Sequence, residues 1–501
     1  MIVSSKHNEL PGSGLSTYAR TRWLLGPVVT AVALLSAPAQ AETIIQALTR
    51  AYQNNPSLKA QRASVLATSE NIERTRAGYR PKVNATADLG VVGEKYRPNP
   101  VGSALDLSRV PRGSGLELNQ NLFDGFRTTN SVVQAKSQTL AARATLRNTE
   151  QVTLYAAVSA YLDVLTDGRI LDFVRENVTT LRAQLTETQG RKSFGDATTT
   201  ELAQIETRLA AATAQAKLAE SIRKTSAANY RRIVGSMPGH LLPARAIDEL
   251  IPSQLEEAVS LAVRDHPAVI AAQHGVAVAL QQIRINRGEL LPTVSLTARL
   301  QQRFDFNARG DSQVYASAFG SISVPLYEGG EVHARIRQAQ HLAEQRDKEA
   351  HAVADEVRSA VTSAWGALQA ARERVASVEA QIRAAETARN GVREEWRMGE
   401  KTLRELLDTE QDMLAARISL ASIERERVLA SYAVAQAVGR LSLSLLAQVQ
   451  LNAKKRVVIA KQDSFTVPSS SRPPRAPDTS ERSSRPCDPA CMIAFEHWKL
   501  R

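Results

Sequence analysis

The sequence has few aromatic residues, almost no cysteine and little proline before its last 40 residues. Aromatic residues make up 5% of the 501 residues, whereas Ala, Gln, Glu, Arg, Leu and Thr dominate, a composition typical of long helices rather than of a large mixed core. The two cysteines, Cys487 and Cys491, stand together near the end of the chain. They either form a small local disulfide or have no role, and as a metal site they lack further ligands apart from His497.

No apolar run is long enough for a membrane-spanning helix. The longest, "WLLGPVVTAVALLSA" at 23–37, has about 15 residues against the ~20 that a spanning helix needs. Two arginines precede it and the small-x-small sequence 39–41 follows, a pattern that predicts a secretory signal peptide over 1–41. An uncleaved membrane anchor is the alternative. We therefore expect an exported protein that starts at Glu42 and that can enter a membrane only through β-strands.

Basic charge is not concentrated on any one ordered segment. Of the net charge of +12, residues 1–41 contribute +2 and residues 451–501 contribute +5, which leaves a mild +5 for the body. A nucleic-acid-binding protein needs a basic stripe on an ordered element, so we expect no nucleic-acid partner. The tail at 446–501 is basic and rich in Pro and Ser, and it is expected to be disordered, either solvated or bound to an acidic surface.

Motifs for catalysis and for cofactors are missing. The sequence contains no phosphate-binding loop, no G-x-S-x-G and no H-E-x-x-H, and its eight histidines are scattered. His333, His341 and His351 fall in a polar helical stretch, where they are expected to be solvated. We therefore expect neither an enzyme nor a cofactor, metal or nucleotide site.

An internal duplication organises the chain. Two repeats, 42–245 and 246–445, carry the same landmarks in the same order. The landmarks are Asn55-Pro56 with His266-Pro267, Arg80-Pro81 with Leu291-Pro292, "LFDGF" at 122–126 with "LYEGG" at 326–330, Gly195 with Gly399, and Val234-Gly235 with Val438-Gly439.

Each repeat predicts the same series of elements. A helix at 43–79 or 253–288 precedes two stretches that alternate between apolar and polar residues, "VNATADLGV" and "LELNQNLF" in the first repeat and "TVSLTARL" and "ASAFGSISVPL" in the second. The Pro- and Gly-rich linker between the first two stretches is expected to be a loop. A long helix then runs from 126 to 194 or from 330 to 398, followed by a turn and a return helix of about 35 residues.

The second long helix carries a heptad seam. Its apolar positions step by four and three residues, which requires a partner helix in a left-handed coiled coil; they are Val357, Val361, Ala364, Leu368, Ala371, Val375, Val378, Ile382 and Ala385.

Four strands from one chain cannot close a barrel, and an open sheet in lipid leaves unpaired backbone groups at its edges. Symmetric association of three chains gives twelve strands, within the range of outer-membrane barrels. The sequence thus predicts an α+β membrane protein with four strands per chain, which close a β-barrel by symmetric association and are continued by long coiled-coil helices.

This duplicated plan resembles the TolC family of outer-membrane channel proteins over residues 42–445. "AAVSAYLDVL" at 156–165, the "LYEGG" strand exit and the "MGEKTLRELLDTE" turn carry the resemblance as well. It implies a homotrimer in the outer-membrane lipid of a Gram-negative bacterium: a trimeric 12-stranded outer-membrane β-barrel, continued by a helical barrel that crosses the periplasm. Such a trimer is a passive exit duct for efflux or type I secretion, and its partners are a periplasmic adaptor and an inner-membrane transporter, either ABC or proton-driven.

The resemblance also implies functional residues at the second turn of each repeat. The periplasmic gate falls on Glu201, Trp396 and Lys401, with Lys401 paired to Glu201. An acidic constriction ring falls on Glu405 and Asp408, which share one helix face. Gly195 and Gly399 mark the two tip turns.

A periplasmic coiled-coil adaptor or scaffold without a barrel is the alternative function. It accounts for export and for the heptads, but not for the paired alternating strands or for two long helices of equal length. The transported substrate cannot be read from the sequence.

Overall fold

The computed structural model describes residues 41–96 and 105–446. The chain divides into two units, 1–442 and 443–501, and every helix and strand named below lies in the first. Nearly all of the expected signal peptide, the tail beyond 446, Cys487 and Cys491 fall outside the described residues.

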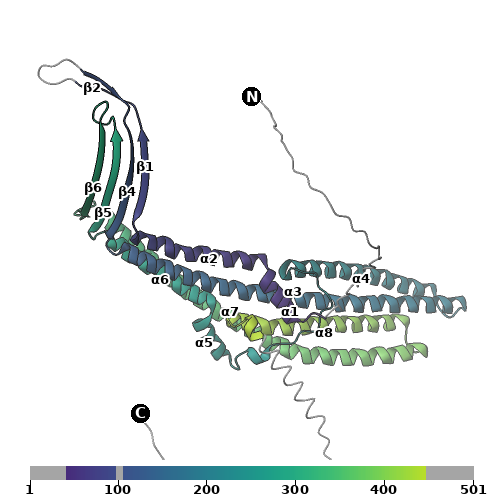
Figure 1. Ribbon diagram of the computed structural model, residues 1–501. Helices are drawn as coiled ribbons and strands as arrows, with labels where there is room; N and C mark the ends of the chain where they lie inside the picture. Colours follow the sequence, from purple (N-terminus) through teal and green to yellow (C-terminus); the bar gives the residue numbers. More distant parts are fainter. Residues whose placement is uncertain (1–40, 97–104, 447–501) are drawn as a thin grey trace, which may run out of the picture. The chain divides into compact units, whose positions relative to one another are not determined.

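The two repeats contain corresponding elements (Figure 1). The first contains α1 (Ile44–Asn54), α2 (Pro56–Arg76), η1 (Ala77–Tyr79), β1 (Lys82–Leu89), β2 (Val92–Tyr96), β3 (Leu105–Arg109), β4 (Arg112–Phe123), α3 (Arg127–Ser193) and α4 (Thr199–Val234). The second contains η2 (Asp248–Leu250), α5 (Leu255–Asp265), α6 (Pro267–Gly288), β5 (Thr293–Phe304), β6 (Ser312–Ser323), α7 (Glu331–Arg397) and α8 (Leu403–Ala437).

The first helix of each repeat is broken where a single helix was predicted. Asn55 and His266 are extended, with ψ of 123° and 130°, because a following proline disfavours the helical region. Each of them is also the N-cap of the next helix: Asn55 Oδ1 accepts from Ser57 N at 3.0 Å, and His266 Nδ1 accepts from Ala268 N at 3.2 Å. The landmark prolines are therefore helix starts within these stretches.

A four-stranded antiparallel sheet in the order β1-β4-β5-β6 joins the two repeats through β4 and β5. Alternate residues of a strand point to opposite sides of the sheet. The register aligns the apolar residues of the four strands on one face and the polar residues on the other. The apolar face contains Val83, Ala85, Leu116, Leu118, Leu296, Ala298, Leu300, Ala316, Ala318 and Ile322. On the polar face Arg299 Nε lies 3.2 Å from Glu117 Oε2, and Thr297 donates to Asn119 at 2.9 Å.

The linker predicted as a loop in the first repeat contains a two-stranded ribbon instead. β2 and β3 pair antiparallel from Val92↔Arg109 to Tyr96↔Leu105. An ion pair between Arg109 and Glu94, at 3.1 Å, lies across this ribbon. The prediction was wrong because it rested on the Pro- and Gly-rich composition of the linker as a whole. That average does not reveal two strands as short as β2 and β3.

The long helices α3 and α7 each have 67 residues, within one residue of their predicted bounds. Each packs along its return helix, α3 with α4 and α7 with α8 (Figure 1). The helices of the two repeats meet where α3 contacts α6 and α8. Within the second repeat, α6 also contacts α7. Among the described residues, none of the helices is both long and apolar enough to cross a membrane.

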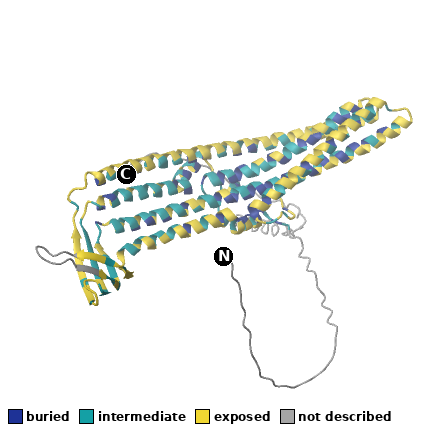
Figure 2. Ribbon diagram, turned by 90° about the horizontal axis from the view of Figure 1, so that it is seen from above, coloured by how far each residue is buried: buried dark blue, intermediate teal, exposed yellow. Residues whose placement is uncertain are grey.

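The buried residues form stripes along the facing sides of these helices (Figure 2). The heptad seam of α7 is one such stripe: Val357, Val361 and Leu368 are buried against residues of α5 and α8. A second cluster lies near the turns and combines α3, α4 and α8, with Ile205 and Leu406 almost fully buried. The edge strands β1 and β6, in contrast, are largely exposed in the single chain, whereas most residues of β4 and β5 are half-buried (Figure 2).

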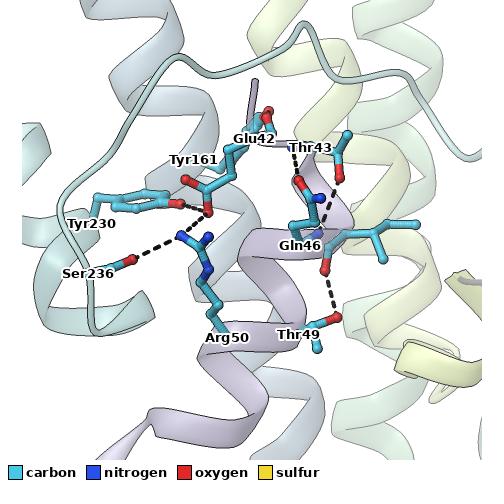
Figure 3. A network of polar contacts seen from close by, with 9 residues as sticks. Glu42, Thr43, Gln46, Thr49, Arg50, Tyr161, Tyr230 and Ser236 are labelled. Atoms are coloured by element: carbon cyan, nitrogen blue, oxygen red, sulfur yellow. Dashed lines mark hydrogen bonds and ion pairs between the residues drawn. The ribbon is translucent and has the colours of Figure 1, made fainter. Parts of the chain in front are cut away.

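A buried polar network joins the start of the described chain to α3, α4 and the segment after α4 (Figure 3). The Glu42 side chain is 5% exposed; its Oε1 accepts from Tyr230 at 2.8 Å and lies 3.2 Å from Arg50 Nη1. The Tyr161 hydroxyl lies 2.8 Å from Glu42 O and 2.6 Å from Leu242 O. Glu42 N also donates to His240 O at 2.8 Å.

Candidate functional site at the helical turns

The turns between the long helices and their return helices are built alike. Gly195 and Gly399 have φ of 87° and 82°, the left-handed region that glycine adopts most readily. After α3, Asp196 N donates to Arg191 O at 2.9 Å and Gly195 N to Lys192 O at 3.0 Å. Glu400 N and Gly399 N make the corresponding bonds after α7. Both turns are therefore Schellman motifs, which satisfy the last carbonyls of a helix.

An acidic residue follows each turn because it completes a capping box. Thr198 Oγ1 accepts from Glu201 N at 3.1 Å, and Glu201 Oε2 accepts from Thr198 N at 2.7 Å. Thr402 and Glu405 repeat the arrangement at the start of α8. Each pair satisfies two backbone N–H groups that the helix start leaves free, so Glu201 and Glu405 have a local structural role.

The carboxylate of Glu405 is held strongly in its charged form. The backbone N–H of Thr402 and the Lys401 ammonium, with Nζ at 3.1 Å, lower the pKa of Glu405 to about 2. Glu405 in turn raises the pKa of Lys401 by accepting its hydrogen bond. The pair Lys401–Glu201, implied by the resemblance, is not formed within the described chain, because each carboxylate bonds at its own turn.

Trp396 lies in the last turn of α7 and packs against the cluster of α3, α4 and α8. The guanidinium of Arg191, at the end of α3, lies 5.4 Å from the centre of the Trp396 ring. Arg191 also donates to Asp196 O at 3.1 Å, so it links its own turn to the other repeat. Sequence reasoning did not find Arg191, since no local pattern relates it to Trp396.

Asp408 is accompanied by two arginines. Arg208 Nη2 of α4 lies 2.6 Å from Asp408 Oδ1, and Arg404 Nε lies 3.8 Å from Oδ2. The first pair joins residues 200 positions apart, so sequence spacing gave no signal for it. A hollow of about 360 Å³ between α4 and α8 lies beside this pair; its lining is Thr200, Ala203, Gln204, Thr207, Arg208, Arg404 and Leu407.

The structure thus brings Lys401, Glu405 and Asp408 together at the start of α8 and leaves Glu201 at the other turn. Within the described ranges, no group of His, Cys, Asp and Glu has the arrangement of a metal site. His333, His341 and His351 are exposed on α7.

The sequence model of the family described as "Outer membrane efflux protein" matches residues 47–236 and 258–440, one match for each repeat. The outer membrane efflux protein BepC of Brucella suis is 36% identical over 425 residues, covering 84% of this chain and 90% of BepC. The outer membrane protein TolC of Escherichia coli is 22% identical and covers 91% of this chain and 92% of TolC.

Solved structures of outer-membrane channels have the same fold. The Campylobacter jejuni CmeC outer membrane channel superposes with a TM-score of 0.71 at 14% identity, over 81% of this chain and 88% of CmeC. The predicted resemblance, the fold class and the outer-membrane location are confirmed. This chain belongs to the outer membrane efflux protein family.

Proposed function

We propose that three copies of this chain form a passive outer-membrane exit duct for efflux or type I secretion. The observation that carries the proposal is the sheet with one apolar face, one polar face and two open edges, β1 and β6. In a membrane barrel the outward face contacts lipid and the inward face contacts water. Four strands from each of three chains close such a barrel and pair both edges, which removes the cost of unpaired backbone groups in lipid.

Cross-linking between the edges tests this assembly. A Thr86→Cys, Ser317→Cys variant places one thiol on β1 and one on β6, in a background where Cys487 and Cys491 are serine. A short bismaleimide applied to whole outer membranes should give covalent trimers that persist after boiling in SDS, whereas either single variant should not. A product that stops at monomer would contradict the closed trimer and favour the alternative of a helical scaffold without a barrel.

We place the gate of the duct at the turns, with Glu201, Trp396 and Lys401 as its residues and with Glu405 and Asp408 at the constriction. Because Glu201 also caps α4, a simple alanine variant confuses two roles. Glu201→Gln keeps the capping geometry and removes the charge, whereas Glu201→Ala removes both. If Glu201 holds the gate by its charge, both variants should raise the open fraction in planar-bilayer recordings. A change seen only with Glu201→Ala would assign Glu201 to the cap alone.

We infer that a periplasmic adaptor docks on the same turns and connects the duct to an inner-membrane transporter. Phe194 and Met398 precede the two glycines and are 85% and 68% exposed, so each turn presents a large apolar side chain that a partner can contact. A photo-cross-linking amino acid at Phe194 or Met398 should capture a periplasmic protein in living cells. The matched control is Leu218, which is 61% exposed on α4 away from the turns. Equal capture at Leu218 would contradict docking at the turns.

A further inference from the structure

We infer that Arg208 and Arg404 neutralise the carboxylates proposed for the constriction and thereby make the pore weakly selective between cations and anions. The inference rests on the proposed function, because it assumes that Glu405 and Asp408 lie at the narrow part of the duct. It differs from the expectation of an acidic ring, which counted the two carboxylates alone.

The ion pairs of Asp408 carry the inference. Arg208 reaches Asp408 from α4 with a nitrogen–oxygen distance of 2.6 Å, and Arg404 approaches the second carboxylate oxygen from one helical turn before. These side chains are half exposed, at 43% for Arg208 and 48% for Asp408, so they remain in contact with water and permeating ions. An ion near Asp408 therefore meets the field of a pair rather than that of a free carboxylate.

The second carboxylate is compensated in the same way. Glu405 accepts from Lys401 at 3.1 Å while its other oxygen bonds Thr402. Glu201, the acid at the start of α4, is bonded to the neutral Thr198 and keeps its charge. Each chain thus brings three carboxylates and three cationic side chains to this level: Glu201, Glu405 and Asp408 against Lys401, Arg208 and Arg404. A threefold arrangement repeats this balance three times and does not build up a strong negative potential.

The hollow between α4 and α8 is a candidate anion-binding site. Arg208 and Arg404 line it together with Thr200, Thr207 and Gln204, whereas no carboxylate does. Guanidinium groups beside hydroxyl and amide donors suit a small hydrated anion such as chloride. An anion bound in this hollow would lie beside the same carboxylates that attract cations.

Selectivity measurements on the full-length trimer in planar bilayers test the inference. Under a KCl gradient the reversal potential of the unaltered protein should indicate weak selectivity. Three charges removed about 10 Å from a permeating ion change the local concentration of each ion by roughly two- to eightfold, with and without screening by salt, and in opposite directions for potassium and chloride. Arg208→Gln should therefore raise the potassium-to-chloride permeability ratio by roughly five- to seventyfold. Asp408→Asn should lower the ratio by a similar factor, and the double variant should return close to the unaltered protein.

Two further variants show whether a change in selectivity comes from these charges or from a disturbed fold. Arg404→Gln changes a side chain that is 79% exposed, so the fold should tolerate it, and it should shift the ratio in the same direction as Arg208→Gln. Arg223→Gln removes a charge from an exposed position of α4 that is 15 residues further along, and it should leave the ratio unchanged. Conducting pores whose selectivity responds to neither Arg208→Gln nor Arg404→Gln would overturn this inference alone. Trimers without any conductance would overturn the proposed duct as well.

Discussion

Replacement of Tyr230 by phenylalanine tests whether the network around Glu42 stabilises the junction of α1, α3 and α4. The ring of Tyr230 is fully buried, and its hydroxyl donates to a carboxylate that is itself 5% exposed. Burial, followed by the bond to Glu42, raises the pKa of Tyr230, so the hydroxyl remains a proton donor at every pH of the assay.

The expected loss follows from the charge of the acceptor. A hydrogen bond to a charged group contributes about 1.5–3 kcal/mol. Its removal leaves Glu42 with Arg50 as its one remaining side-chain partner among the described residues. Tyr230→Phe should therefore destabilise each chain by about 2 kcal/mol. With an unfolding entropy of roughly 2.1 cal/mol/K per residue over about 400 ordered residues, this corresponds to about 2–3 °C in Tm.

Circular dichroism of the detergent-solubilised protein at pH 7 measures the effect, and the shift should be read against a matched control. Tyr155→Phe removes a hydroxyl from α3 that makes no hydrogen bond among the described residues, so Tm should stay within error. A double-mutant cycle with Glu42→Gln should give a coupling of about 1 kcal/mol or more. Equal Tm values for Tyr230→Phe and Tyr155→Phe would refute the reasoning.

Three other predictions concern the helix ends. Burial lowers the pKa of His266, so the free energy of unfolding should fall as pH drops below about 6.5, where the unfolded chain binds the extra proton. His266→Asn copies Asn55, the N-cap at the same place in the first repeat, and should flatten this part of the pH-stability curve. Gly399→Ala places a Cβ at a φ of 82° and should cost about 1 kcal/mol in chemical unfolding, whereas alanine at Gly366, within α7, should be neutral or stabilising. The pKa of Glu405 is lowered to about 2, so the stability that its cap contributes should persist above pH 4.5 and be lost between pH 4.5 and 2. Glu405→Gln should remove this acid transition, and an unchanged transition would place its origin elsewhere.

Local patterns accounted for much of the architecture. The duplication, the bounds of α3 and α7 and the strands of the main sheet follow from periodicity and from glycine and proline positions. The Thr-x-x-Glu sequences after the two glycines also contain the capping boxes, a structural role that Glu201 and Glu405 have in addition to those proposed for them at the gate and the constriction. The breaks at Asn55 and His266 were missed, since a continuous helix was preferred over the local effect of proline.

The sequence by itself determined two repeats of helices and strands, because helix periodicity, strand alternation and capping depend on residues a few positions apart. Only the tertiary structure decided that β4 pairs with β5, that Arg191 approaches Trp396 and that Arg208 binds Asp408. These contacts join residues about 200 positions apart. The pairing of β4 with β5 forms the middle of the sheet, whereas the two contacts of the arginines form only once α3, α4, α7 and α8 pack together at the turns. The pairs Lys401–Glu405 and Arg404–Asp408 are local, four residues apart, whereas the contribution of Arg208 to the charge balance of the candidate site is a property of the packed helices.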